Sequence, residues 1–307
     1  MDGLYQLGLY KYKDKASNYA TLPDTLKGET MAGSCAVLQL LMGKLSVLDD
    51  EDKIIYRPRE NYIELPYKRV TGSGSRSDYD DYKIAFGVDT FDNETKERID
   101  NYLRGDIRNK FIYEHVLHEL TLALILMDKS PTESFVHIYR TLEFMSYTFP
   151  LIYTSKDKNY MGSFNSLKEY FNGGEGDGEL KFFDKFIKTL FQDDEEIYGF
   201  MFEILLTTDR LEEMKRDFQN SIQEIGKKGI HNYYLEVNTL KIEFSKMQGI
   251  LIEIRNKYFH MLAGKGTNNF YGMDYDINDL FRSINPYFVN WIASIYSKIF
   301  QYRLETM

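Results

Sequence analysis

From residue 106 to the C-terminus, apolar side chains recur at a spacing of three and four residues almost without interruption. This spacing gives a helix one continuous apolar face and is the main sequence signal of helical structure. Proline, which interrupts helices, occurs only 6 times in 307 residues. We expect Pro150 to end one helix and Pro286 to kink or divide another. The pattern predicts a mainly α protein with helices at 107–127, 132–149, 163–171, 180–191, 195–206, 210–225, 233–262 and 278–304.

The first hundred residues have a mixed pattern. Residues 4–12 and 53–67 carry β-branched and aromatic residues in broken alternation, which is typical of half-buried strands. Residues 31–48 and 93–103 have helical spacing instead. We therefore expect an N-terminal α+β region at 1–128 with a regulatory or partner-binding role, followed by an all-α domain at 129–307.

The composition excludes several classes of protein. With 38 Lys and Arg against 47 Asp and Glu, the net charge is −9, whereas a general duplex-binding protein carries a broad basic face. The one cysteine, Cys35, rules out an internal disulfide and a multi-cysteine zinc site, and fits a reducing compartment. No apolar run is long enough to span a membrane, and the N-terminus lacks the pattern of a secretory signal. We expect a cytoplasmic protein without a membrane partner.

The segment 233–262 has apolar character on two sides. Its inner side is a seam in which residues alternate in steps of four and three. The seam consists of Leu240, Phe244, Met247, Leu251, Ile254, Tyr258 and Met261. The opposite side carries Gly249, Ile252, Asn256 and His260. A helix of this kind packs against two neighbours, and the outer one can be the same helix of a second subunit.

The end of this segment, LIEIRNKYFH, contains Arg255, Asn256 and His260. An Arg-Asn pair with a histidine four to six residues after the arginine, near the end of a long helix, resembles the motif of the HEPN superfamily (higher eukaryotes and prokaryotes nucleotide-binding domain). The helix at 134–150, with Arg140 and Glu143 among apolar residues, is similar to the opening helix of many such domains. The resemblance covers about residues 132–307.

The resemblance implies a HEPN-like helical bundle and a metal-independent endoribonuclease, with no cofactor and no metal. It implies a homodimer in which two Arg/His sets form one composite cleft, so we expect the surface of Gly249 and Ile252 to lie near the two-fold axis. HEPN ribonucleases are commonly toxins or effectors of anti-phage and abortive-infection systems. The implied partners are an RNA substrate and a regulator encoded in the same operon, such as an ATPase, an antitoxin or a nucleotidyltransferase.

The residue types fit RNA cleavage without metal. A histidine such as His260 can act as base or acid at neutral pH, and Arg255 can hold the phosphorane oxygens. Asn256 can orient the ribose or the imidazole. Lys257 and Lys265 are candidates for binding backbone phosphates. Because residues 209–265 hold ten Lys and Arg against eight Asp and Glu, this segment is slightly basic and suits a short, flexible RNA.

Other interpretations of the same residues remain open. Arg255 and His260 can be cations at a helix C-terminus, where they interact favourably with the helix dipole. Glu143 can be an ion-pair partner of Arg140 rather than a supporting active-site residue. His115, His118 and Glu119 have the wrong spacing for a zinc site. The alternative function is a non-catalytic HEPN-like scaffold, sensor or nucleotide-binding subunit of a larger defence complex.

Overall fold

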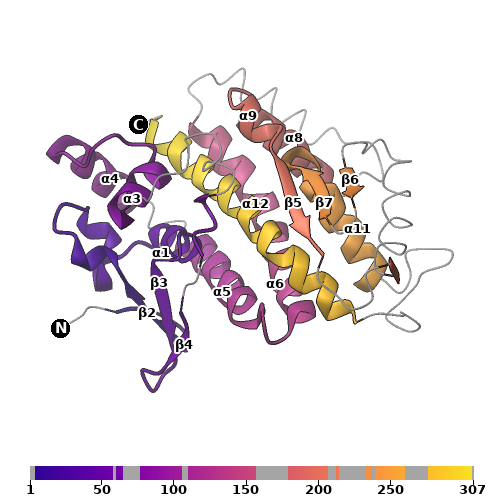
Figure 1. Cartoon of the computed structure of the whole chain (residues 1–307). Coiled ribbons are helices and arrows are strands. Elements are labelled where there is room, and N and C mark those ends of the chain that lie inside the picture. The colour runs from indigo at the N-terminus through magenta and orange to yellow at the C-terminus, as the bar shows by residue number, and fades with distance from the viewer. Residues whose placement is uncertain are drawn as a thin grey trace.

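A computed structural model of the chain describes residues 4–57, 60–64, 77–105, 110–156, 179–206, 212–213, 233–236, 239–259 and 276–305 (Figure 1). The predicted helix at 163–171 and nearly all of the one at 210–225 lie outside these residues, as do His260, Lys265 and the side chain of Lys257. The described part of the chain is mainly helical, which confirms the mainly α class. Its α-helices are α1 (Gly33–Leu41), α3 (Asp78–Phe86), α4 (Asn93–Gly105), α5 (Lys110–Leu126), α6 (Pro131–Lys156), α8 (Glu179–Leu190), α9 (Glu195–Tyr198), α11 (Met247–Phe259) and α12 (Ile277–Glu305).

Helices α5, α6 and α12 form the centre of the molecule. α6 packs against both α5 and α12, and α1 packs against α5. In Figure 1, α12 crosses the middle of the molecule, with the N-terminal elements on one side and α11 with its neighbouring strands on the other. Residues on several sides of α12 are buried, among them Phe288, Trp291 and Tyr296. A helix buried on more than one side belongs in the interior of a domain.

Two helices continue through prolines that were expected to disrupt them. α6 passes Pro150 and ends at Lys156, and α12 passes Pro286 without dividing. A proline in a helix interior costs about 3 kcal/mol, because it removes one backbone hydrogen bond and crowds the preceding turn. Both helices bury apolar side chains beyond the proline, Ile152 in α6 and Phe288 in α12, and this packing offsets the local cost.

The N-terminal region contains an antiparallel sheet of four strands in chain order, β1 (Tyr5–Leu7), β2 (Tyr10–Asp14), β3 (Leu45–Leu48) and β4 (Ile54–Tyr56). The single helix predicted at 31–48 is wrong at its end, since α1 stops at Leu41 and β3 begins at Leu45. Gly43 lies between them with φ +68°, a left-handed conformation that ends the helix. The mixed α+β character expected of this region is therefore present.

Residues 129–307 are predicted to be all-α, but a three-stranded antiparallel sheet lies within them. Its strands are β5 (Met201–Leu205), β7 (Thr239–Glu243) and β6 (Tyr233–Glu236), in that spatial order. The helix predicted at 195–206 is instead the short α9 followed by β5, and the one predicted at 233–262 is β6, β7, a 3₁₀ turn and α11. In β5 and β7 burial alternates from residue to residue, which is the period of a strand.

One hydrophobic core extends across the predicted boundary at 128/129. The Phe300 ring of α12 meets the ring of Phe86 in α3 edge-on, with centroids 5.0 Å apart. The Tyr296 hydroxyl donates a hydrogen bond of 2.8 Å to the carbonyl of Ser34 in α1. Helix α12 thus packs on elements of both regions. Among the helices that the structure describes, none is both long and apolar enough to span a membrane.

The turn at Gly43 gives a test of this architecture. A Cβ atom at Gly43 would lie 2.4 Å from the carbonyl oxygen of Glu60, whereas one at Gly8 (φ +59°) would meet nothing within 4 Å. Gly8→Ala should lower the free energy of unfolding by about 1–2 kcal/mol through left-handed strain alone. Gly43→Ala should lower it by roughly a further 1–3 kcal/mol because of the steric clash. Equal denaturation midpoints for the two variants in urea would contradict this arrangement.

Candidate functional site

Arg255 and Asn256 lie in the penultimate turn of α11 and contact each other. The Arg255 guanidinium donates a hydrogen bond of 3.1 Å from Nη1 to Oδ1 of Asn256. It also lies 5.0 Å from the centre of the Tyr139 ring on α6. A guanidinium over an aromatic face is held by cation–π attraction, so these contacts fix the orientation of both polar side chains. Arg255 and Asn256 are half-buried, and solvent reaches part of each.

Helix α11 is anchored on α6 and α12 by its inner seam and its last turn. Among the described residues, every seam member from Leu240 to Tyr258 is buried, although Leu240 belongs to β7 rather than to the helix. Phe259, the last residue of α11, stacks on Phe135 of α6 with the rings 12° from parallel and 5.6 Å apart. The opposite face, with Gly249 and Ile252, is only half-buried. His260 follows Phe259 directly in the sequence and lies outside the described residues.

A second polar cluster joins α5 and α6. Nδ1 of His137 lies 2.7 Å from Oε2 of Glu119, and the Arg140 guanidinium lies 3.6 Å from Oε1 of the same carboxylate. Glu143 is one candidate partner of Arg140 from the sequence, and the structure places the Arg140 guanidinium beside Glu119 on the neighbouring helix. His137 and Arg140 are three residues apart, so they share one face of α6. That spacing is visible in the sequence, whereas the position of Glu119 opposite them depends on how α5 and α6 pack.

The carboxylate of Glu119 is the electrostatic centre of this cluster. Burial opposes its ionisation, but the hydrogen bond with His137 and the nearby charges of Arg140 and the imidazoles outweigh burial, so the pKa of Glu119 lies below its ordinary value. An ionised Glu119 accepts a hydrogen bond from Nδ1 of His137 and thereby fixes the orientation of the ring. The cluster can hold an imidazole in place and present the partly exposed Arg140 to solvent.

The other histidines that the structure describes lie on the exposed face of α5. The His115 ring packs between Phe111 and Phe144, at centroid distances of 4.3 and 5.1 Å, and the His118 ring lies 6.1 Å from that of Tyr10. Within the described ranges, no group of three or more His, Cys, Asp or Glu side chains is arranged to hold a metal ion. These histidines take part in ring contacts.

Comparison of the chain with protein families, with characterised proteins and with solved structures finds no match.

The depressed pKa of Glu119 predicts how stability depends on pH. The pKa of Glu119 is lower in the folded chain than in the unfolded one. The carboxylate therefore stabilises the fold at pH values above 4.5, the ordinary pKa of this group. That contribution is lost as the pH falls through the folded pKa. Glu119→Gln should reduce the free energy of unfolding at pH 7 by about 1–2 kcal/mol, and the deficit should shrink below pH ~4.

Thermal denaturation at pH 7 and pH 3.5, followed by circular dichroism, measures this effect. Glu133→Gln, at an exposed position in the first turn of α6, is the control and should change stability little at either pH. A deficit for Glu119→Gln of the same size at both values would show that the carboxylate charge has no stabilising role.

Proposed function

We propose that the chain is a metal-independent endoribonuclease of HEPN type, with Arg255, Asn256 and His260 as its catalytic residues. The observation that carries the proposal is the contact between Arg255 and Asn256 on α11, one turn before His260 in the sequence. Both side chains are half-buried and oriented, so they combine a fixed geometry with access for a substrate. Both belong to the motif by which the sequence resembles the HEPN superfamily.

The proposed reaction needs no group beyond these side chains and the RNA. The ribose 2′-hydroxyl loses its proton and attacks the adjacent phosphorus, the bond to the 5′-oxygen breaks, and that oxygen takes up a proton. His260 serves as the acid or base, because an imidazole gains and loses protons near neutral pH. Arg255 stabilises the negative charge of the phosphorane. The products are a 2′,3′-cyclic phosphate and a 5′-hydroxyl.

The surrounding elements suit such a site. Helices α6, α11 and α12 pack together, in keeping with the helical bundle that the resemblance implies. Arg140 and Glu143 lie on α6, and we assign them supporting roles, while Lys257 and Lys265 are proposed to bind backbone phosphates. The biological role that accompanies the proposal is that of an anti-phage or toxin effector, with an RNA substrate and an operon-encoded regulator as partners.

A second candidate function is favoured by the contacts of Arg255. Its guanidinium is engaged by the Tyr139 ring and the Asn256 amide, which is also what a purely structural arginine would show. On this alternative the chain is a non-catalytic HEPN-like scaffold, sensor or nucleotide-binding subunit of a larger complex. The two candidates differ in whether the purified protein cleaves RNA.

The variant His260→Ala should abolish RNA cleavage and leave the fold intact. The wild-type protein is incubated with total RNA in the presence of EDTA, and the new ends are analysed for 2′,3′-cyclic phosphate. Loss of the acid–base group should lower the cleavage rate by a factor of about 10²–10⁴. His118→Ala, at an exposed position on α5, is the matched control and should cleave at the wild-type rate.

Wild-type rates for His260→Ala would refute the catalytic assignment of this histidine. An intact, monodisperse wild-type protein that leaves RNA uncut in these assays would favour the non-catalytic alternative instead.

The composite cleft further predicts a homodimer through the half-buried face of α11. Ile252→Asp places a charge at the proposed two-fold axis, where it would be desolvated, and should convert the dimer to a monomer with loss of cleavage. Leu151→Asp changes an equally aliphatic residue that is 51% exposed on α6, and it should remain dimeric. Sedimentation equilibrium distinguishes the two states. A wild-type protein that is monomeric at all concentrations would exclude the composite cleft.

A further inference from the structure

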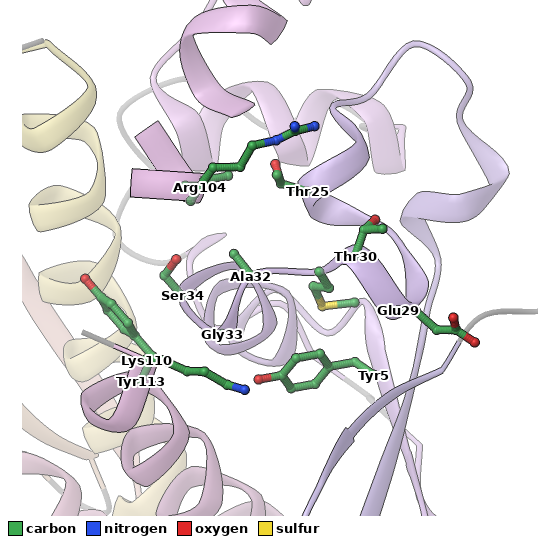
Figure 2. Close-up of a pocket in the computed structure, with 12 residues that line it drawn as sticks. Tyr5, Thr25, Glu29, Thr30, Ala32, Gly33, Ser34, Arg104, Lys110 and Tyr113 are labelled. Atoms are coloured by element: carbon green, nitrogen blue, oxygen red, sulfur yellow. The ribbon is translucent and has the colours of Figure 1, made fainter. Parts of the chain in front are cut away.

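A cavity of about 280 Å³ opens at the first turn of α1, in the N-terminal region and apart from the polar residues of α11 (Figure 2). Its walls come from segments far apart in the sequence: β1, the 3₁₀ turns before α1, the end of α4 and the start of α5. Gly33 and Ser34, the first two residues of α1, form part of the lining. The described side chains around them combine hydrogen-bond donors, positive charge and apolar surface.

The first turn of α1 has no side-chain cap. Its N-cap residue is Ala32, which carries no acceptor for the N–H groups of that turn. The same chain caps α3 fully, since Ser77 accepts from the N–H of Asp80 and Asp80 interacts in return with Ser77. The N–H groups of Gly33 and Ser34 have no carbonyl partner within a helix that starts there. They therefore face the cavity as donors at the positive end of a helix dipole.

Tyr5 supplies a second and independent donor. The side chain is 8% exposed, and its hydroxyl has no hydrogen-bond partner among the described residues. The hydroxyl oxygen would lie 3.4 Å from a Cβ atom on Gly33, so it points to the first turn of α1. Burial, together with the nearby Glu114 carboxylate, raises the pKa of Tyr5 to about 12, which keeps the phenol protonated. A buried donor without an acceptor is costly unless a ligand or water accepts from it.

Two cations complete the polar wall. Arg104, in the last turn of α4, is exposed and forms no ion pair with any residue that the structure describes. Lys110, at the start of α5, contacts Glu114 at 3.4 Å and is 60% exposed. Figure 2 shows the ends of Lys110 and Tyr5 pointing toward one another, and the carboxylate of Glu29 directed away from Gly33. Both cations line the cavity; in Figure 2 the Lys110 ammonium lies beside the Tyr5 hydroxyl, whereas the Arg104 guanidinium extends toward Thr25.

We propose that this cavity binds the phosphate group of a small phosphomonoester, held by the N–H groups of Gly33 and Ser34, the Tyr5 hydroxyl and the cations of Arg104 and Lys110. Such an anion matches the donors, because it offers several acceptor oxygens and up to two negative charges. A volume of about 280 Å³ exceeds that of the phosphate alone, and the apolar Met31 and Leu103 line the remainder. The organic part of the ligand is therefore small. This inference does not depend on the proposed ribonuclease activity.

Isothermal titration calorimetry with ribose 5-phosphate and with inorganic phosphate tests the assignment, with ribose as the control that lacks the anion. Saturable binding of ribose 5-phosphate, weaker binding of inorganic phosphate and no binding of ribose are expected. A dinucleoside phosphodiester such as UpU should bind at least roughly tenfold more weakly than ribose 5-phosphate, because it carries one charge fewer. Failure of both phosphate probes to bind would overturn the proposal, and an affinity for UpU equal to that for ribose 5-phosphate would overturn the assignment to a monoester.

Two variants connect the binding to these residues. Tyr5→Phe removes only the hydroxyl, and Arg104→Gln removes one charge at an exposed position, so both should fold. Each should weaken ribose 5-phosphate binding by about tenfold, the typical value of one charge-assisted hydrogen bond. Arg98→Gln, which removes a charge from an exposed position elsewhere on α4, should bind like the wild type. Wild-type affinity in the Tyr5→Phe and Arg104→Gln double variant would show that the anion binds elsewhere.

Discussion

The burial of α12 is the constraint on which the rest of the structure depends. This helix buries aromatic side chains toward both regions of the chain, and removing so much apolar surface from water is the largest favourable term available to the fold. Phe300 packs on Phe86, and Tyr296 donates to the carbonyl of Ser34, so α12 joins the N-terminal elements to the α5–α6 pair. Its burial also explains why the helix continues through Pro286, because an interruption there would expose a large part of the core.

Helix α6 connects the two polar clusters of the candidate site. It carries Tyr139 and Phe135 on the side that meets α11, and His137 and Arg140 on the side that meets α5. A shift of α6 relative to α5 would therefore disturb both the Arg255–Tyr139 contact and the Glu119–His137 pair. Both pairs therefore depend on the position of one helix.

Much of the helical structure could be predicted from the sequence, while most contacts across it could not. Helices α4, α5, α8 and α12 follow from apolar spacing, whereas the contact of Arg255 with Asn256 does not, because adjacent residues of a helix point in different directions. The second sheet was missed because Leu240, Phe244 and Met247 keep the spacing of a helical seam although Leu240 lies in a strand. Local spacing cannot distinguish these cases when the same residues face the core in both. The Glu119–His137 pair depends on tertiary packing and has no local signal.

The walls of the cavity at α1 have a consequence for the N-terminal region as a whole. They are assembled from segments around residues 5, 30, 104 and 110, which are brought together only when the chain is folded. An anion bound there would favour the folded chain by mass action, by about 2.7 kcal/mol at a concentration one hundred times its Kd. The abundance of that anion in the cell would then set how often this region opens, and with it the lifetime of the protein against proteolysis.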